Sequence, residues 1–117
     1  MTALRLVLST IDSEDRAKTL ARLLVQENLA ACVTIVSSVT SIYKWRKALE
    51  ESTEWLLVIK TSEARLSQLM SRVKELHPFE VPEIIAFPIE TAHAAYLDWA
   101  LEATGGRPLD DARDSRD

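Results

Sequence analysis

The chain has 117 residues, a net charge of -4 and a hydrophobic content of 47%. This length fits one globular domain with a buried core, and the acidic balance argues against nucleic acid as a partner, because phosphate binding requires a basic surface. The single cysteine excludes an internal disulfide and any Cys-x-x-Cys metal motif. No apolar run approaches the ~20 residues that span a bilayer, and the N-terminus lacks the pattern of a signal peptide. We therefore expect a cytoplasmic protein with no membrane partner.

The N-terminal residues predict a strand followed by a helix. Residues 3–10 are short and β-rich, and they end in a polar pair. Apolar residues at helical spacing then predict a helix over about 13–27. Asp12 or Ser13 is its expected N-cap, and Asn28 is its expected C-terminal stop.

The next segment predicts a long β-hairpin. Residues 30–45 and 48–60 are rich in β-branched and aromatic residues, and we place the tip near Arg46 to Ala48. The Ser37–Ser38 pair predicts a bulge or bend in the first of these strands. Cys32 lies in the apolar run "LAACVTIV" and is interpreted as a buried small hydrophobe, in preference to a reactive thiol.

The second half of the chain predicts a helix, a strand and a shorter helix. The first helix covers about 61–77 and ends before Pro78, because the residue before proline avoids the α region. The strand, 83–90, contains Pro88, which places it at a sheet edge or a strand end. The last helix covers 92–104 and is closed by two glycines.

This order of elements predicts the fold class. The sequence β-α-β-β-α-β is typical of an α+β, ferredoxin-like sandwich, in this case with an extended hairpin and a short C-terminal helix. We expect one domain over residues 1–106 and a disordered polar tail over 107–117. The two main helices would cover one face of the sheet and leave the other open, although the strands are apolar on both sides. An exposed apolar sheet calls for a partner, so we expect a homo-oligomer with its open sheet faces packed together.

Few residues remain to carry chemistry. The chain has no Gly-rich phosphate loop, no HExxH pair and no assembled nucleophile–base pair, so we expect neither an enzyme nor an organic cofactor. What remains is a set of polar and aromatic residues next to the apolar strands. They are Tyr43, Trp45, Lys60, His77, Glu80, Glu83, Tyr96 and Trp99.

His77 is open to two interpretations. As a metal ligand it would act with Glu80 and Glu83, because imidazole suits copper, zinc or nickel and carboxylates can complete such a site. Alternatively, it caps the end of the preceding helix or forms a hydrogen bond with a neighbouring group. Lys60 likewise has two interpretations, as an anion-binding group or as a surface lysine with a buried stem.

The sequence resembles the CutA-type divalent-cation tolerance proteins from residue 4 to about 103. The matching segments are "LAACVTIV", "TSIYKW", "LLVIKT", "VKELHPFEVPEII" and "YLDWALEAT". The resemblance implies a ferredoxin-like fold and a compact homotrimer in which the hairpins and sheets of three subunits interlock. It also implies an architecture similar to the trimeric PII signalling proteins, with lateral clefts between subunits.

The resemblance further implies tolerance of copper and other divalent cations. One bacterial branch of the family binds copper through a cysteine at the end of the first strand and two adjacent histidines. In this sequence the cysteine position is Ser9, the first histidine position is Leu76, and only His77 matches. The family's Pro-Gly in the long strand is replaced by Ser37–Ser38, and its hairpin glycine by Lys47.

These inferences lead to one leading function and two alternatives. The leading function is divalent-cation tolerance by a homotrimer, with copper, another divalent cation or a small ligand bound in a cleft between subunits. The candidate metal ligands are His77, Glu80 and Glu83, and the candidate cleft residues are Tyr43, Trp45, Lys60, Tyr96 and Trp99. The alternatives are a PII-like sensor of small molecules or anions, and a trimeric scaffold for protein partners.

Overall fold

The computed structural model describes residues 1–105; the domain boundary expected at 106 and the tail expected over 107–117 lie outside these residues. The elements in chain order are β1 (Leu4–Ile11), α1 (Glu14–Gln26), β2 (Cys32–Trp45), β3 (Ala48–Ser62), α2 (Leu66–Leu76), β4 (Ile85–Pro88) and α3 (Ala94–Ala103). A single 3-10 turn, Glu63–Arg65, precedes α2. The predicted order of strands and helices is therefore confirmed.

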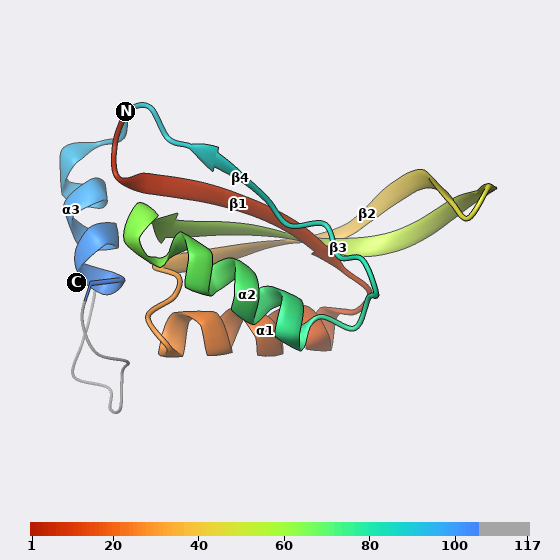
Figure 1. Ribbon diagram of the computed structural model, residues 1–117. Helices are drawn as coiled ribbons and strands as arrows, with labels where there is room; N and C mark the ends of the chain where they lie inside the picture. Colours follow the sequence, from red (N-terminus) through yellow and green to blue (C-terminus); the bar gives the residue numbers. More distant parts are fainter. Residues whose placement is uncertain (106–117) are drawn as a thin grey trace.

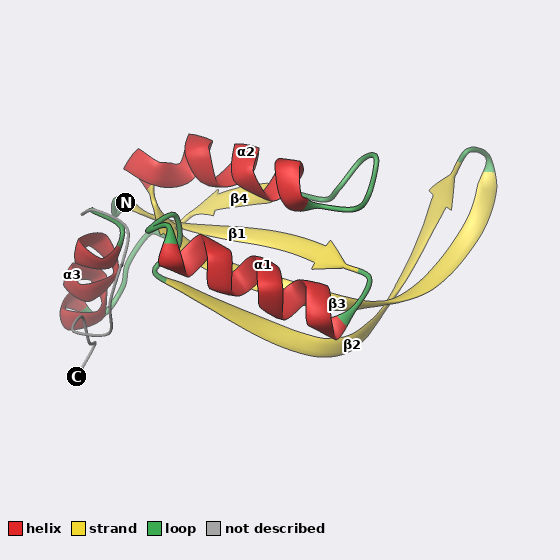
Figure 2. Ribbon diagram, turned by 90° about the horizontal axis from the view of Figure 1, so that it is seen from below, coloured by secondary structure: helices red, strands yellow, loops and turns green. Residues whose placement is uncertain are grey.

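The four strands form one antiparallel sheet in the order β2-β3-β1-β4. Helices α1 and α2 lie together on one face of this sheet, and α3 lies at the end opposite the hairpin tip (Figures 1 and 2). β4 is an edge strand, and Pro88 pairs with Arg5 at its end. This agrees with the edge position that the proline predicted, because proline cannot donate to a ladder.

Strand alternation places the hydrophobic core between the sheet and the two helices. Val7 and Ile11 of β1 face the helices, and their register partners on β3 include Ile59. The helices contribute apolar residues at helical spacing, all of them at most 3% exposed: Leu20, Leu24, Leu69 and Val73. Burial of such side chains is worth about 1.5–3 kcal/mol each.

The ends of the helices follow local sequence signals. The Ser13 Oγ accepts a hydrogen bond from the Arg16 amide at 3.1 Å, which caps α1. Asn28 has a φ of 59°, the left-handed conformation that ends helices. Ser62 accepts from the Arg65 amide at 3.3 Å and opens the 3-10 turn before α2. Ser13, one of the two expected N-caps, and Asn28 lie where the sequence predicted them.

The β2–β3 hairpin extends well beyond the helices (Figures 1 and 2). Its register shifts between Val36 and Val39, and Ser38 within this bulge has a φ of 62°. At the tip, Arg46 and Lys47 have φ values of 52° and 71°. Positive φ at both central residues is the geometry of a two-residue turn between twisted strands. The predicted bulge and tip are confirmed, and none of these three positions is a glycine.

The face of the sheet away from α1 and α2 carries many apolar side chains, beside polar residues such as Lys60. The registers place seven apolar side chains on it, from all four strands: Leu6, Leu8, Val36, Leu56, Val58, Ile85 and Phe87. Three of these, Val36, Ile85 and Phe87, are 42%, 45% and 43% exposed in the single chain. An apolar surface continuous over four strands is a surface that another chain would cover.

Two segments differ from the sequence prediction. The strand expected over 83–90 covers only Ile85–Pro88, and one further bond, from the Ile89 amide to the Leu4 carbonyl at 3.2 Å, continues the pairing beyond it. Glu83 and Ile84 lie in irregular backbone before the strand. His77, expected at the end of a helix, has an extended backbone with φ -79° and ψ 137°, because Pro78 follows it. Among the described residues, no helix has the length and apolar character required to cross a membrane.

Candidate functional site

The eight residues singled out from the sequence lie in two separate regions of one chain. Lys60, Tyr96 and Trp99 lie where the sheet meets α3. The other five are Tyr43 and Trp45 on β2 of the hairpin, His77 at the end of α2, and Glu80 and Glu83 between α2 and β4. Figure 1 shows the hairpin and this loop away from α3. The molecule measures 46 Å along its longest axis. Within residues 1–105 of a single chain, the eight residues are therefore not brought together, and the cleft predicted between subunits stays a prediction.

The region beside α3 is built from two aromatic rings and one lysine. Tyr96 and Trp99 lie one helical turn apart on α3, with ring centroids separated by 5.5 Å. Both rings pack against a small cluster that contains Leu4 and Ala31. The Lys60 Nζ donates to the Thr34 Oγ1 at 2.9 Å and to the Val58 carbonyl at 3.1 Å. Lys60 is thus already engaged within its own sheet.

Cys32 pairs with Lys60 across the ladder, on the open face of the sheet. It is half-buried in the single chain, so the full burial expected from the sequence is not reached there. Its sulfur lies 4.0 Å from the Thr34 Oγ1.

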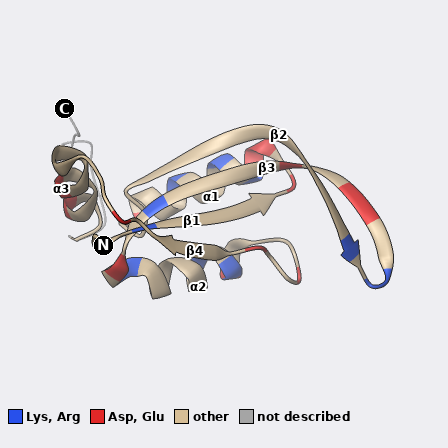
Figure 3. Ribbon diagram, turned by 90° about the horizontal axis from the view of Figure 1, so that it is seen from above, with Lys and Arg blue, Asp and Glu red and all other residues tan. Residues whose placement is uncertain are grey.

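The hairpin tip contacts the loop that follows α2. The Arg46 Nη2 lies 2.8 Å from a Glu80 carboxylate oxygen, and the two side chains are each 70% exposed. The same guanidinium lies 5.3 Å from the ring centroid of Trp45, which is a cation–π arrangement. Figure 3 shows the basic tip at the end of the hairpin, beyond an acidic stretch of β3. Arg46 therefore joins two segments that are 34 residues apart.

His77 is almost buried, at 8% exposure, and both of its ring nitrogens are hydrogen-bonded. Nε2 lies 2.7 Å from the carbonyl oxygen of Thr10, at the end of β1. Nδ1 accepts a hydrogen bond from the Phe79 amide at 3.1 Å. The Phe79 ring packs edge-on against the imidazole, with centroids 4.7 Å apart. Of the two interpretations left open by the sequence, this is the geometry of hydrogen bonding to neighbouring groups.

The donor set implied by the family does not form a metal site within one chain. Among residues 1–105, no group of three or more His, Cys, Asp or Glu side chains is arranged to hold a metal ion. At the family's cysteine position, Ser9 is fully buried, and its hydroxyl has no hydrogen-bond partner within the described part of the chain. Glu80 is paired with Arg46, and Glu83 is exposed.

Two residues outside the predicted set form notable contacts or lie buried near these segments. Arg46, at the predicted hairpin tip, links the tip to Glu80. Glu54 on β3 is only 6% exposed and pairs with Val39 beside the bulge. The alternation of side chains along β3 could have identified Glu54 from the sequence. It lies on the same strand face as Leu56 and Val58, where a carboxylate is unusual among apolar neighbours.

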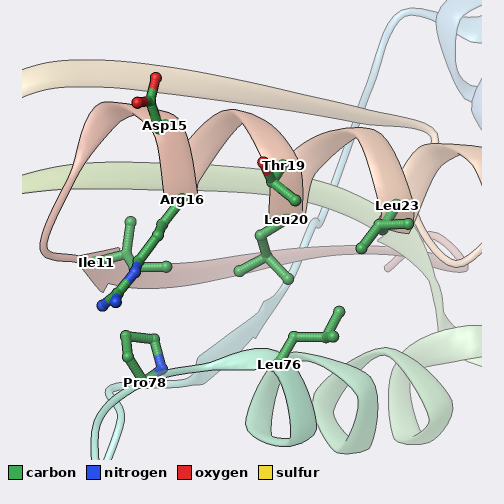
Figure 4. A pocket seen from close by; sticks show the side chains of 8 residues that line it. All are labelled: Ile11, Asp15, Arg16, Thr19, Leu20, Leu23, Leu76 and Pro78. Carbon is green, nitrogen blue, oxygen red and sulfur yellow. The ribbon is translucent and has the colours of Figure 1, made fainter.

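A separate groove of about 360 Å³ lies in the helix layer, between α1 and the end of α2 (Figure 4). Its apolar lining comes from α1, Ile11 and the end of α2; the Arg16 side chain extends toward Ile11 and Pro78, and Asp15 points away from them (Figure 4). The Arg16 guanidinium is paired with Asp12 at 2.9 Å. The lining residues are Ile11, Asp15, Arg16, Thr19, Leu20, Leu23, Leu76 and Pro78. None of the eight predicted site residues lines this groove.

Comparison with known proteins places the chain in a family. The family model described as "CutA1 divalent ion tolerance protein" matches residues 5–103. A curated divalent-cation tolerance protein CutA from Thermus thermophilus is 50% identical over 99 residues, which is 85% of this chain and 96% of that protein. Human protein CutA is 41% identical over 95 residues, or 81% of this chain, and the matched region spans only 53% of the human protein.

Solved structures agree with the sequence matches. The Thermus thermophilus Cut A1 structure superimposes with a TM-score of 0.84 at 49% identity, covering 87% of this chain and 99% of that chain. The CutA structure from Xylella fastidiosa gives a TM-score of 0.86 at 34% identity, covering 88% and 99%. The chain belongs to the CutA1 divalent ion tolerance family.

Proposed function

We propose that this protein acts in divalent-cation tolerance as a cytoplasmic homotrimer, and that a cation or small ligand binds in clefts between its subunits. The family membership supports the general role. The assembly, the cleft and the ligand are argued from the arrangement of the residues.

One observation carries the proposal: the candidate cleft residues lie in two regions of an elongated chain. Tyr96 and Trp99 lie on α3 at one end, whereas Tyr43 and Trp45 lie on the hairpin towards the other. A cleft that contains both pairs requires the hairpin of one subunit to reach the α3 end of another. The hairpin extends beyond the helices (Figure 1), and its side chains are exposed in the single chain, with Ile42 at 65% and Leu49 at 76%.

The open sheet face supports the same assembly. Its apolar residues span all four strands, and its exposed rows would be buried if the sheets of several copies packed together. Burial of apolar surface yields about 25 cal/mol per Å². Lys60 and Cys32 lie on this face, so their surroundings in the assembly would include groups from a second subunit.

Within such a cleft, the exposed carboxylates of Glu80 and Glu83 are the groups that would meet a cation, and Glu80 would exchange its ion pair with Arg46 for that cation. Oxygen donors of this kind suit hard divalent cations, and they contribute to zinc and copper sites when other ligands are present. A complete coordination shell would need donors from more than one subunit, since one chain provides no group of three among its described residues.

The proposal is tested by mass and by cation binding. Light scattering should give three times the 13.2 kDa chain mass; a monomer would refute the assembly. Copper and zinc should then be titrated by calorimetry into the metal-free protein and into the Glu80→Gln, Glu83→Gln double variant. We expect weaker binding in the variant. Equal binding in both, or no binding in either, would count against the cation site placed here.

The basic hairpin tip favours a second candidate, a sensor of anionic small molecules. Lys44, Arg46 and Lys47 are exposed and close in sequence at the tip (Figure 3). In a trimer they would line the mouth of each cleft. A rise in melting temperature with an anionic metabolite, lost in an Arg46→Gln, Lys47→Gln variant, would favour this candidate over cation binding.

A further inference from the structure

The imidazole of His77 occupies a gap at the edge of the sheet. β4 pairs with β1 only as far as Leu8, whereas β1 itself continues to Ile11. Beyond Leu8, the edge of β1 on the β4 side therefore has no strand partner. The Nε2 of His77 lies 2.7 Å from the Thr10 carbonyl oxygen at this position. The ring thus provides a donor to the end of β1 where no β4 residue does.

The two hydrogen bonds together fix the tautomer of His77. A carbonyl oxygen can only accept, so Nε2 must carry the hydrogen. A backbone amide can only donate, so Nδ1 must present its lone pair to Phe79. The neutral Nε2–H tautomer is the form that satisfies both partners. A metal ion binds imidazole through a ring lone pair, and the single lone pair of this tautomer is already in use.

We infer that His77 is a positioning residue that ties the loop after α2 to the end of β1, and that it is not a metal ligand in the folded chain. The loop carries Glu80, three residues on, and Glu80 meets Arg46 at the hairpin tip. His77 therefore fixes the loop on which the tip rests. Its effect on subunit contacts rests on the proposed trimer, but the hydrogen bonds and the tautomer do not.

Three variants of His77 separate its hydrogen bond to Thr10 from its hydrogen bond to Phe79. His77→Asn keeps a short acceptor for the Phe79 amide, because an asparagine oxygen commonly bonds the backbone two residues on, but it does not reach Thr10. His77→Gln can place a donor near Thr10 but loses the acceptor. His77→Leu loses both. We expect the Phe79 amide to exchange about tenfold faster in the Gln and Leu variants and close to the wild-type rate in the Asn variant. Equal exchange in all four proteins would overturn the inference.

The decisive measurement uses the wild-type, full-length protein, so it does not depend on whether a variant folds. Long-range ¹H–¹⁵N spectra of the labelled protein report the tautomer of each histidine. His93 is the internal control, because it is exposed and forms no side-chain cap with α3. We expect the Nε2–H tautomer for His77 and ring resonances that do not shift when Zn²⁺ is added. The Nδ1–H tautomer, or a Zn²⁺-dependent shift of the His77 ring that persists in His93→Gln, would overturn the inference.

These outcomes differ from those that decide the proposed function. If zinc binds the trimer while the His77 ring is unaffected, both conclusions stand. If zinc does not bind the wild-type protein, the proposed cation cleft fails, and the tautomer and the exchange rates still decide the role of His77. If zinc binding and the His77 shift appear together, the cation role stands and the inference is rejected.

Discussion

Arg72 on α2 and Glu27 at the end of α1 form a two-point ion pair. The Nε and Nη2 atoms of Arg72 lie 2.9 and 2.8 Å from the two carboxylate oxygens of Glu27. Arg72 also bonds Glu75, one turn along its own helix. Hydrogen bonds to Glu27 and then to Glu75 raise the pKa of Arg72 above its ordinary value, so these contacts favour the charged guanidinium. One arginine thus joins the two helices that cover the core.

Replacing this arginine tests whether the geometry of the pair matters beyond its charge. Arg72→Lys keeps the positive charge but cannot form two parallel bonds to one carboxylate. We expect a lower melting temperature than wild type, with a difference that shrinks as salt is added, because the side chain is 30% exposed. Arg22→Lys, on the exposed side of α1, is the control and should leave the melting temperature unchanged. An equal decrease in melting temperature in Arg72→Lys and Arg22→Lys would contradict the expectation.

Replacing Ser9 or Ser13 by alanine should change the free energy of unfolding in opposite directions. The Ser9 hydroxyl is fully buried without a hydrogen-bond partner in residues 1–105, and an unsatisfied buried group costs about 1–3 kcal/mol. Ser9→Ala should therefore raise the free energy of unfolding by about 1 kcal/mol. The Ser13 hydroxyl caps α1, so Ser13→Ala should lower it by about 1 kcal/mol. Denaturant unfolding at one protein concentration measures both, and a loss of stability in Ser9→Ala would show that its hydroxyl is satisfied in solution.

Two hairpin positions should gain stability from glycine. Ser38 and Lys47 have φ values of 62° and 71°, a region that costs L-residues about 1–2 kcal/mol and costs glycine nothing. Each substitution by glycine should raise the free energy of unfolding by about 1 kcal/mol. Ser37→Gly is the adjacent control, because Ser37 is not among the positive-φ residues. It should lower stability by about 0.5–1 kcal/mol, and a gain equal to that of Ser38→Gly would contradict the argument.

A charge on the open sheet face should disrupt assembly. Phe87 lies on this face and is 43% exposed in the single chain. In the proposed trimer, Phe87→Asp would bury an unpaired carboxylate between subunits, which is strongly unfavourable. We expect light scattering to give a mass below that of wild type, with the helical signal in circular dichroism retained. Thr19→Asp on the helix layer is the control and should keep the wild-type mass; a Phe87→Asp protein of unchanged mass would argue against this face as the interface.

The sequence predicted most of the elements because their signals are local. Helical spacing, the serine caps and Asn28 identified α1, and the Ser37–Ser38 pair identified the bulge in β2. The weaker predictions concern the segment after α2. β4 is shorter than the predicted 83–90, and the backbone of His77 is extended because Pro78 follows it.

The candidate site was less predictable than the fold. The selection of polar and aromatic residues near apolar strands named His77 and Glu80 as candidates, but it did not predict what each of them contacts. The partner of His77 is a carbonyl 67 residues away, and the partner of Glu80 is an arginine on the hairpin. No periodicity connects residues so far apart in the chain. The separation of Trp45 and Trp99 in space likewise depends on how far the hairpin extends beyond the sheet.

The sequence by itself determined the order of strands and helices, the ends of α1, the bulge and the family, because caps, alternation and turn residues act over a few neighbouring positions. The tertiary structure alone decided the state of individual side chains. It placed His77 between Thr10 and Phe79 with both nitrogens engaged, left the Ser9 hydroxyl buried without a described partner, and brought Arg46 to Glu80. Whether a ring lone pair is in use, a buried hydroxyl has a hydrogen-bond partner or a carboxylate is ion-paired depends on the groups within about 3 Å of it. Which groups those are follows from the packing of distant segments.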